Sequence, residues 1–266
     1  MLIVGHSRTA HPGTWAWPAG LIVWGPGNHT SSHAHHSIQV VMALSGRLKT
    51  RGSSAERWGS AGAVIVPPDV THEIDARGRT ILIAFIDPES ALGRAMTARA
   101  ARAMTRVADS DVQRWRRLLG PSSSIREAAL RKWLEQELGS GTEPGVMDPR
   151  VATVIRVLRE RTVDLEGTSL GSLASLAGLS PSRFTHLFAA SVGIPLRRYL
   201  LWLRVQRAGA ALSSVQTVTE AAYIAGFSDA AHLTRTFRRM LGIVPSEILR
   251  HRARALEVRL DDPPHS

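Results

Sequence analysis

The heptapeptide ASLAGLS at residues 174–180 has a near copy, AYIAGFS, at residues 222–228. The likeness extends past each heptapeptide, because GIPLRRYL at 193–200 corresponds to GIVPSEIL at 242–249. A segment that recurs within one chain indicates a structural unit that is built twice. The repeat therefore predicts that this part of the chain contains two similar structural units.

Each copy has the spacing of two helices joined by a tight turn. Gly178 falls where the chain leaves the first helix, a position that favours a residue free to adopt positive φ. Ser180 can cap the next helix, and Pro181 suits its first position because a proline there loses no hydrogen bond. In the second copy Ser228 or Asp229 is the expected cap. The apolar residues before the first turn recur at helical spacing, at Leu170, Leu173, Ala174 and Ala177.

The second helix of each copy is expected to face solvent with polar and basic side chains. A helix of this kind after a short turn is the element that lies in the DNA major groove in helix-turn-helix proteins. A single helical hairpin with a glycine turn is also common in proteins that do not bind DNA. Two copies in one chain are a far more specific signal.

Residues 148–252 resemble the DNA-binding domain of the AraC/XylS family of bacterial transcription regulators, most closely over residues 221–249. The resemblance implies an all-α domain with two helix-turn-helix motifs, promoter DNA and RNA polymerase as partners, and no enzymatic activity. It implies that the following residues meet DNA: Ser182, Arg183, Thr185, His186, Ala231, His232, Arg235, Arg238 and Arg239. Arg235 is the best candidate for reading a base, since a guanidinium can bond both O6 and N7 of guanine. Arg183, Arg238 and Arg239 are expected to bind phosphates, which gives affinity without sequence choice.

Composition agrees with a DNA-binding protein of the cytoplasm. The formal net charge is +11, and all basic side chains except Lys49 and Lys132 are arginines. A basic balance favours polyanionic partners, although an arginine-rich proteome would produce the same excess. The chain has no cysteine, which excludes disulfides and zinc-thiolate sites. Without a long apolar run or a signal-peptide pattern, we expect a soluble cytoplasmic protein with no membrane contact.

Residues 1–87 have short apolar runs separated by turn residues, which predicts a small antiparallel barrel or jelly roll. Its histidines and glycines resemble the two motifs of the cupin superfamily, with His33, His35 and Gln39 in the first and His72 in the second. Gln39 stands where the family usually has glutamate. The second motif also departs, because it has Asp69 in place of glycine, is one residue short and lacks an asparagine after His72.

His33 and His35 are two residues apart on a predicted strand, so their rings should share one face. With His72 from a neighbouring strand and the carbonyl oxygen of Gln39, they could hold Zn, Ni, Mn or Fe as a divalent ion. Alternatively, the same residues line a pocket for a small-molecule effector, as in many sensor domains of this regulator family, or are ordinary core or surface histidines. His29 and His36 are expected to be solvated. The tryptophans of this domain are expected in its core, or as a wall of the effector pocket.

Residues 88–138 are rich in alanine, arginine and leucine, and their periodicity predicts helices that support the barrel or form a homodimer. The candidate dimer contacts are Trp115, Leu118, Leu119, Leu130 and Trp133. Residues 139–147 have the composition of a flexible linker, and residues 253–266 that of a frayed tail.

The fold expected for the whole chain is α+β, with a cupin-like barrel, a helical region and a helical DNA-binding domain. The function expected is sequence-specific regulation of transcription, controlled by a small molecule or metal ion in the barrel. A metal-dependent cupin enzyme fused to a DNA-binding domain is the main alternative, and an architectural DNA-binding protein is the third.

Overall fold

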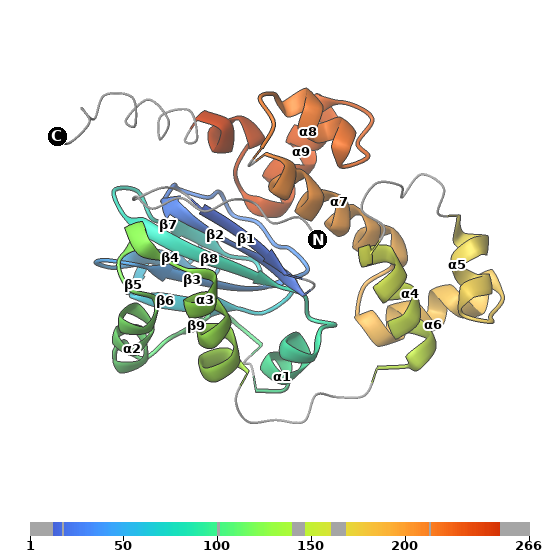
Figure 1. Ribbon diagram of the computed structural model, residues 1–266, viewed down its shortest axis with the longest axis horizontal. Coiled ribbons are helices and arrows are strands. Elements are labelled where there is room, and N and C mark those ends of the chain that lie inside the picture. The colour runs from blue at the N-terminus through green and yellow to red at the C-terminus, as the bar shows by residue number, and fades with distance from the viewer. Residues whose placement is uncertain are drawn as a thin grey trace.

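The computed structural model describes residues 13–17, 19–99, 102–139, 147–160, 169–212 and 214–250. Strands occupy the first part of these residues and helices the rest, and the two parts lie side by side (Figure 1). The fold is therefore mixed α+β, with an N-terminal sheet domain and a helical C-terminal region, as predicted. The predicted linker, apart from its two end residues, and the predicted tail lie outside the described residues.

Two antiparallel sheets form the N-terminal domain. The larger has the strand order β1-β2-β8-β3-β6-β9, and the smaller has the order β5-β4-β7. Most of the strands coincide with apolar runs of the sequence, because β-branched side chains pack well on a pleated surface. The strands are β1 Gly13–Trp17, β2 Gly20–Pro26, β3 Ile38–Ala43, β4 Leu48–Arg51, β5 Gly59–Ala61, β6 Ala63–Val66, β7 Glu73–Asp75, β8 Thr80–Ile86 and β9 Thr105–Arg106.

The central strand β3 is buried along its whole length. Alternate side chains of a strand point to opposite faces, and both faces of β3 are covered. Val40 and Met42 belong to a core that the large sheet shares with helices, while Val41 and Ala43 belong to a second core shared with the small sheet. The continuous apolar sequence of β3 thus serves two cores.

Helices cover the outer face of the large sheet (Figure 1). Trp115 and Trp133 meet edge to face in this layer, with ring centroids 5.5 Å apart, and both are buried. Leu119 and Leu130 are buried in the same core. The prediction that these four residues contact a second subunit is wrong, because they fill the core of their own chain. The elements of this layer are α1 Ala91–Arg99, α2 Asp109–Leu119, the short 3-10 turn η1 Ser122–Ser124, α3 Glu127–Trp133 and the π-helical turn η2 Leu134–Leu138.

The C-terminal helices form two small cores along the central helix α7. The first core joins α4, α5 and α6 to the start of α7, and the second joins α8 and α9 to its end. Each of these two cores therefore contains one copy of the sequence repeat. The helices are α4 Pro149–Glu160, α5 Leu170–Leu176, α6 Pro181–Val192, α7 Leu196–Ala211, α8 Val218–Ile224 and α9 Ala230–Leu241.

The turns between paired helices follow the sequence signals. Gly178 and Gly226 have φ of +64° and +74°, a region that glycine enters without steric cost. The Ser180 hydroxyl caps α6 by accepting a hydrogen bond from Arg183 N–H. The carboxylate of Asp229 caps α9 by accepting from His232 N–H at 2.6 Å. Of the two caps predicted for α9, the structure therefore selects the aspartate.

Candidate functional site

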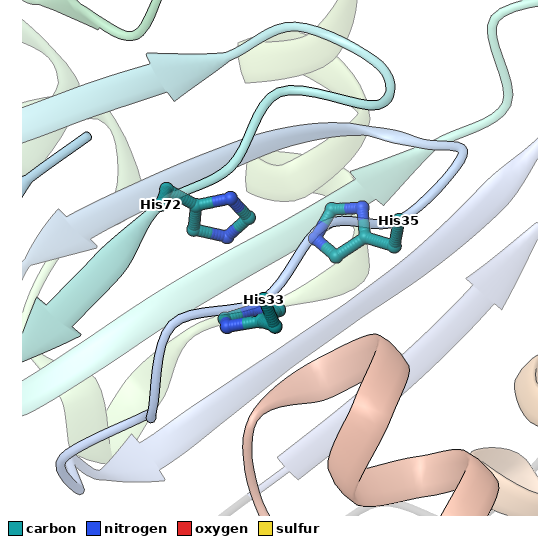
Figure 2. Close-up of side chains that lie close together, drawn as sticks. All are labelled: His33, His35 and His72. Carbon is teal, nitrogen blue, oxygen red and sulfur yellow. The ribbon is translucent and has the colours of Figure 1, made fainter. Parts of the chain in front are cut away.

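Three buried histidines lie close together in the N-terminal domain (Figure 2). His33 and His35 lie in the segment between β2 and β3, and His72 lies just before β7. Two backbone hydrogen bonds tie the segments together: His33 N–H donates to His72 O (3.1 Å), and His72 N–H donates to His33 O (2.9 Å). Each of the three residues offers one nitrogen atom that lies within 4.8 Å of the other two. The fold thus brings together residues 39 positions apart in the chain (72 minus 33).

Hydrogen bonds at Nδ1 decide which ring nitrogen of two histidines carries the proton. Nδ1 of His33 lies 2.7 Å from the carbonyl oxygen of Ser31, and Nδ1 of His72 lies 2.9 Å from that of Val70. Because a carbonyl oxygen can only accept, each Nδ1 carries a hydrogen, and each Nε2 presents a lone pair. Nδ1 of His35 lies 2.9 Å from the hydroxyl oxygen of Ser37, which can donate or accept, and it accepts a long hydrogen bond from Ser37 N–H (3.4 Å).

The three Nε2 atoms and Oε1 of Gln39 are buried and make no hydrogen bond of normal geometry within the described part of the chain. The side chain of Gln39 nevertheless lies close enough to His35 to act on the pKa of that imidazole. Burial, together with the neighbouring His72, lowers the pKa of the His33 imidazole to about 3. The pKa values of His35 and His72 are also lowered, again mainly by burial. The three rings are therefore neutral near pH 7. The converging lone pairs of His33 and His72 are costly in a protein interior, unless a cation or a ligand donor satisfies them.

The donor set fits a divalent transition-metal ion. Neutral imidazole nitrogens bind Zn, Ni and Fe well, and an amide oxygen is an acceptable additional ligand. The carbonyl contacts at Nδ1 are also those usual for metal-binding histidines, since a second hydrogen bond fixes the ring and raises the basicity of the other nitrogen. His33, His35 and His72 would hold the ion, and Gln39 lies on β3 as a further candidate.

His36 is buried, which contradicts the expectation that it is solvated. Its Nδ1 lies 2.8 Å from Asp69 and its Nε2 lies 2.7 Å from Glu89. Burial lowers the pKa of His36, but hydrogen bonds to the two carboxylates outweigh that effect and raise the pKa to about 9. His36 is therefore a charged residue, and sequence periodicity could not show this because both carboxylates come from distant segments. His29 is exposed, as expected, although its ring pairs with Glu73 at 2.9 Å.

A buried ionic cluster joins the N-terminal domain to the C-terminal helices. Asp87, which follows β8, and Glu89 both pair with Arg159 of α4, at 2.9 and 3.2 Å. The carboxylate of Asp87 also accepts hydrogen bonds from the α7 side chains of Gln206 (2.7 Å) and Trp202 (3.4 Å). Burial raises the pKa of Asp87 to about 6, against the effect of the Arg159 guanidinium. The sequence does not predict this cluster, since an aspartate directly after a strand is typical of a turn.

The predicted DNA-contacting side chains lie on α6 and α9. Arg183 and His186 of α6 are exposed, as are Arg235 and Arg239 of α9. Ser182, Ala231 and Arg238 are exposed as well. Thr185 and His232 are half-buried. The Thr185 hydroxyl donates to the Ser182 carbonyl (2.8 Å), and His232 stands edge-on to Phe227. Within the described residues, the basic side chains of α6 and α9 are therefore free of the protein core.

Comparisons with known proteins agree with this organisation. A profile of the helix-turn-helix domain matches residues 173–251, which include both helix pairs. The apo structure of ToxT from Vibrio cholerae superimposes with a TM-score of 0.56 over 88% of this chain and 97% of ToxT, at 10% sequence identity. ToxT with a bound unsaturated fatty acid gives a TM-score of 0.52 over 87% of this chain and 95% of that chain, also at 10% identity.

A regulator with an AraC-type DNA-binding domain from Chromobacterium violaceum is 26% identical over 40% of this chain and 93% of its own, with a TM-score of 0.36. The profile match shows that residues 173–251 form a helix-turn-helix domain of the AraC type. A domain of this type supports a DNA-binding regulator of transcription. The likeness to ToxT is one of fold, and it extends over both the sheet domain and the helical region of this chain. No helix in the described part of the chain is long and apolar enough to span a bilayer.

Proposed function

We propose that this regulator reads a specific operator with α6 and α9 and responds to a divalent metal ion bound by His33, His35 and His72. In this proposal α5–α6 and α8–α9 are the two helix-turn-helix motifs. The two readers enter successive major grooves on one face of the duplex, about 34 Å apart. The exposed arginines on both helices support this arrangement.

Arg235 and Arg239 are expected to contribute in different ways. Replacing Arg235 by alanine should cost about 1–3 kcal/mol on the preferred site and relax the choice at one base pair. Replacing Arg239 by alanine should weaken binding to all sequences alike. It should also reduce, by about one, the steepness with which the logarithm of the binding constant falls with the logarithm of the salt concentration. Binding isotherms should be measured at several salt concentrations, on an operator selected from a random duplex pool and on a random duplex. They distinguish base reading by Arg235 from phosphate binding by Arg239. Equal losses on both duplexes for Arg235→Ala would contradict the assignment of base reading.

The main support for a metal ion is the convergence of three buried imidazole nitrogens, each within 4.8 Å of the other two. Hydrogen bonds to backbone carbonyls already fix the metal-binding tautomer of His33 and His72. All-nitrogen ligation favours Zn or Ni over Mn, which prefers carboxylates and water. When bound, the ion would supply a fixed positive charge that holds the two segments together.

A catalytic role for the ion is the weaker alternative. Gln39 takes the position at which the cupin motif usually has glutamate, so the site lacks that candidate acid or base. The fold neighbours and the family are those of regulators. We therefore propose a sensor without turnover. Comparing turnover of candidate substrates in the zinc-loaded protein and in an apo sample would reveal an enzyme.

An organic effector is the second candidate, and an open surface pocket of about 420 Å³ is a place where it could bind. The stacked rings of Trp15 and Trp17, with centroids 5.2 Å apart, line this pocket together with Leu92 of α1 and Leu134 of η2. The fatty-acid complex of ToxT shows that a protein of this fold can bind a small apolar molecule. Thermal-shift screening of the full chain against metabolites, with Trp17→Ala as control, tests this candidate.

Two measurements test the proposal as a whole. Selection from a random duplex pool should recover a defined site, whereas an architectural protein would recover none. Elemental analysis of protein purified without added chelator should find close to one equivalent of Zn or Ni per chain. A homodimer and contact with RNA polymerase are further proposals that the family relationship supports.

A further inference from the structure

The DNA-binding half of the chain forms one side of the histidine cluster. The indole of Trp202, on α7, stacks on the imidazole of His35 with centroids 5.7 Å apart and an angle of 20° between the rings. Phe85 of β8 meets the same imidazole edge-on, at 5.6 Å. His35 is thus held by one aromatic side chain from each half of the chain. Figure 2 shows a helix of the C-terminal half close to the cluster.

The end of α9 makes a second contact of this kind. The carbonyl oxygen of Gly242, the residue after α9, accepts a hydrogen bond from Ser31 N–H at 3.1 Å. The carbonyl oxygen of Ser31 in turn accepts from Nδ1 of His33. The approach is close, because a Cβ atom at Gly242 would lie 2.6 Å from Nδ1 of His33. The orientation of His33 therefore also depends on the C-terminal half.

We infer that Trp202 is a positioning residue of the metal site, and that metal binding and docking of the DNA-binding half on the sheet domain stabilise each other. This inference rests on the proposed metal site and adds the means by which metal binding acts on the DNA-binding half of the chain. In the docked arrangement, contacts from α7 and α9 orient two of the three metal-binding imidazoles. If the DNA-binding half left the sheet domain, both imidazole rings would lose these contacts. The bound ion would then have to order the two rings itself.

The sign of the coupling follows from this geometry. If docking raises the affinity for the ion, the ion must favour docking by the same factor, because linkage between two equilibria is reciprocal. A ligand shifts a conformational equilibrium only through its preference for one arrangement. Here the docked arrangement is preferred, since only that arrangement holds His33 and His35 in place.

Metal affinity of the full chain tests the role of Trp202. Zinc should be titrated in competition with a colorimetric chelator, for the wild type, Trp202→Ala, Trp202→Phe and Trp58→Ala. Trp202→Ala should weaken zinc binding by about 10–100-fold, the usual effect of removing a group that orients a metal ligand. Trp202→Phe should retain most of the affinity, because it keeps an aromatic face against His35. Trp58→Ala makes the same change at a tryptophan that is 39% exposed and should leave the affinity unchanged.

A second measurement does not require a core substitution. Because the chain lacks cysteine, Ser54→Cys in the sheet domain and Ser175→Cys on α5 give one pair of spin labels at exposed positions. Zinc should narrow the distribution of distances between the labels, and a chelator should broaden it. Unchanged distributions, or equal zinc affinities of Trp202→Ala and the wild type, would overturn the inference and leave the metal site intact. A wild-type chain that binds no zinc would overturn the metal site itself.

Discussion

Replacing His72 by alanine is expected to abolish specific zinc binding, with a loss of affinity of more than about 100-fold. Removing a group that only orients a metal ligand typically costs 10–100-fold, and losing a ligand should cost more. The side chain of His72 is fully buried, and its Nε2 makes no hydrogen bond to any residue that the structure describes. Thermal denaturation with and without zinc gives a direct measurement. At zinc concentrations about 1,000 times the dissociation constant, the wild type should gain about 4 kcal/mol, and the variant should gain nothing.

His29→Ala is the matched control for His72→Ala. His29 is exposed and pairs with Glu73, away from the three converging nitrogens. Its removal should leave the stabilisation by zinc intact. If His72→Ala were stabilised by zinc as strongly as the wild type, the ion would be bound elsewhere and the histidine site would be refuted.

The second large effect is expected at Asp87. Removing one partner of a buried ion pair usually costs about 3–5 kcal/mol. In Asp87→Ala, Arg159 keeps Glu89 as a partner, while the donors of Gln206 and Trp202 lose their acceptor. We therefore expect a loss near the lower limit, about 3 kcal/mol, in the free energy of unfolding measured with urea.

Glu160→Ala serves as the control for Asp87→Ala. Glu160 pairs with Arg156 on the surface of α4, where both side chains are more than 60% exposed. An exposed pair of this kind should contribute less than about 1 kcal/mol. Equal effects of the two substitutions would show that the Asp87 cluster contributes little to holding the domains together.

Local signals in the sequence were sufficient to predict the helical half of the fold. The glycine turns, the Ser180 cap and the proline that begins α6 act within a few residues, so they can be read from the sequence alone. The apolar strands were also predictable, because their length and composition are local properties. Leu170 is an exception: it fits the apolar periodicity of α5, yet it is 42% exposed at the first position of that helix.

The candidate site was only partly predictable. The spacing of His33 and His35, together with the motif resemblance at His72, pointed to one site. The burial of His36 and the stacking of Trp202 on His35 depend on contacts between distant segments, and periodicity does not report such contacts. The hydrogen bond from Trp202 to Asp87, for example, joins residues 115 positions apart. Such pairings follow from the packing of one domain on the other.

Operator affinity measured with and without zinc tests the central claim most directly. The selected operator should be titrated with the wild type and with His72→Ala at one fixed salt concentration, first with zinc and then with a chelator. A coupling free energy of about 1–3 kcal/mol predicts a change of roughly 5–150-fold in the dissociation constant of the wild type, and no change for His72→Ala. The same operator affinity in zinc and in chelator for a wild-type chain that binds zinc would contradict metal control of DNA reading.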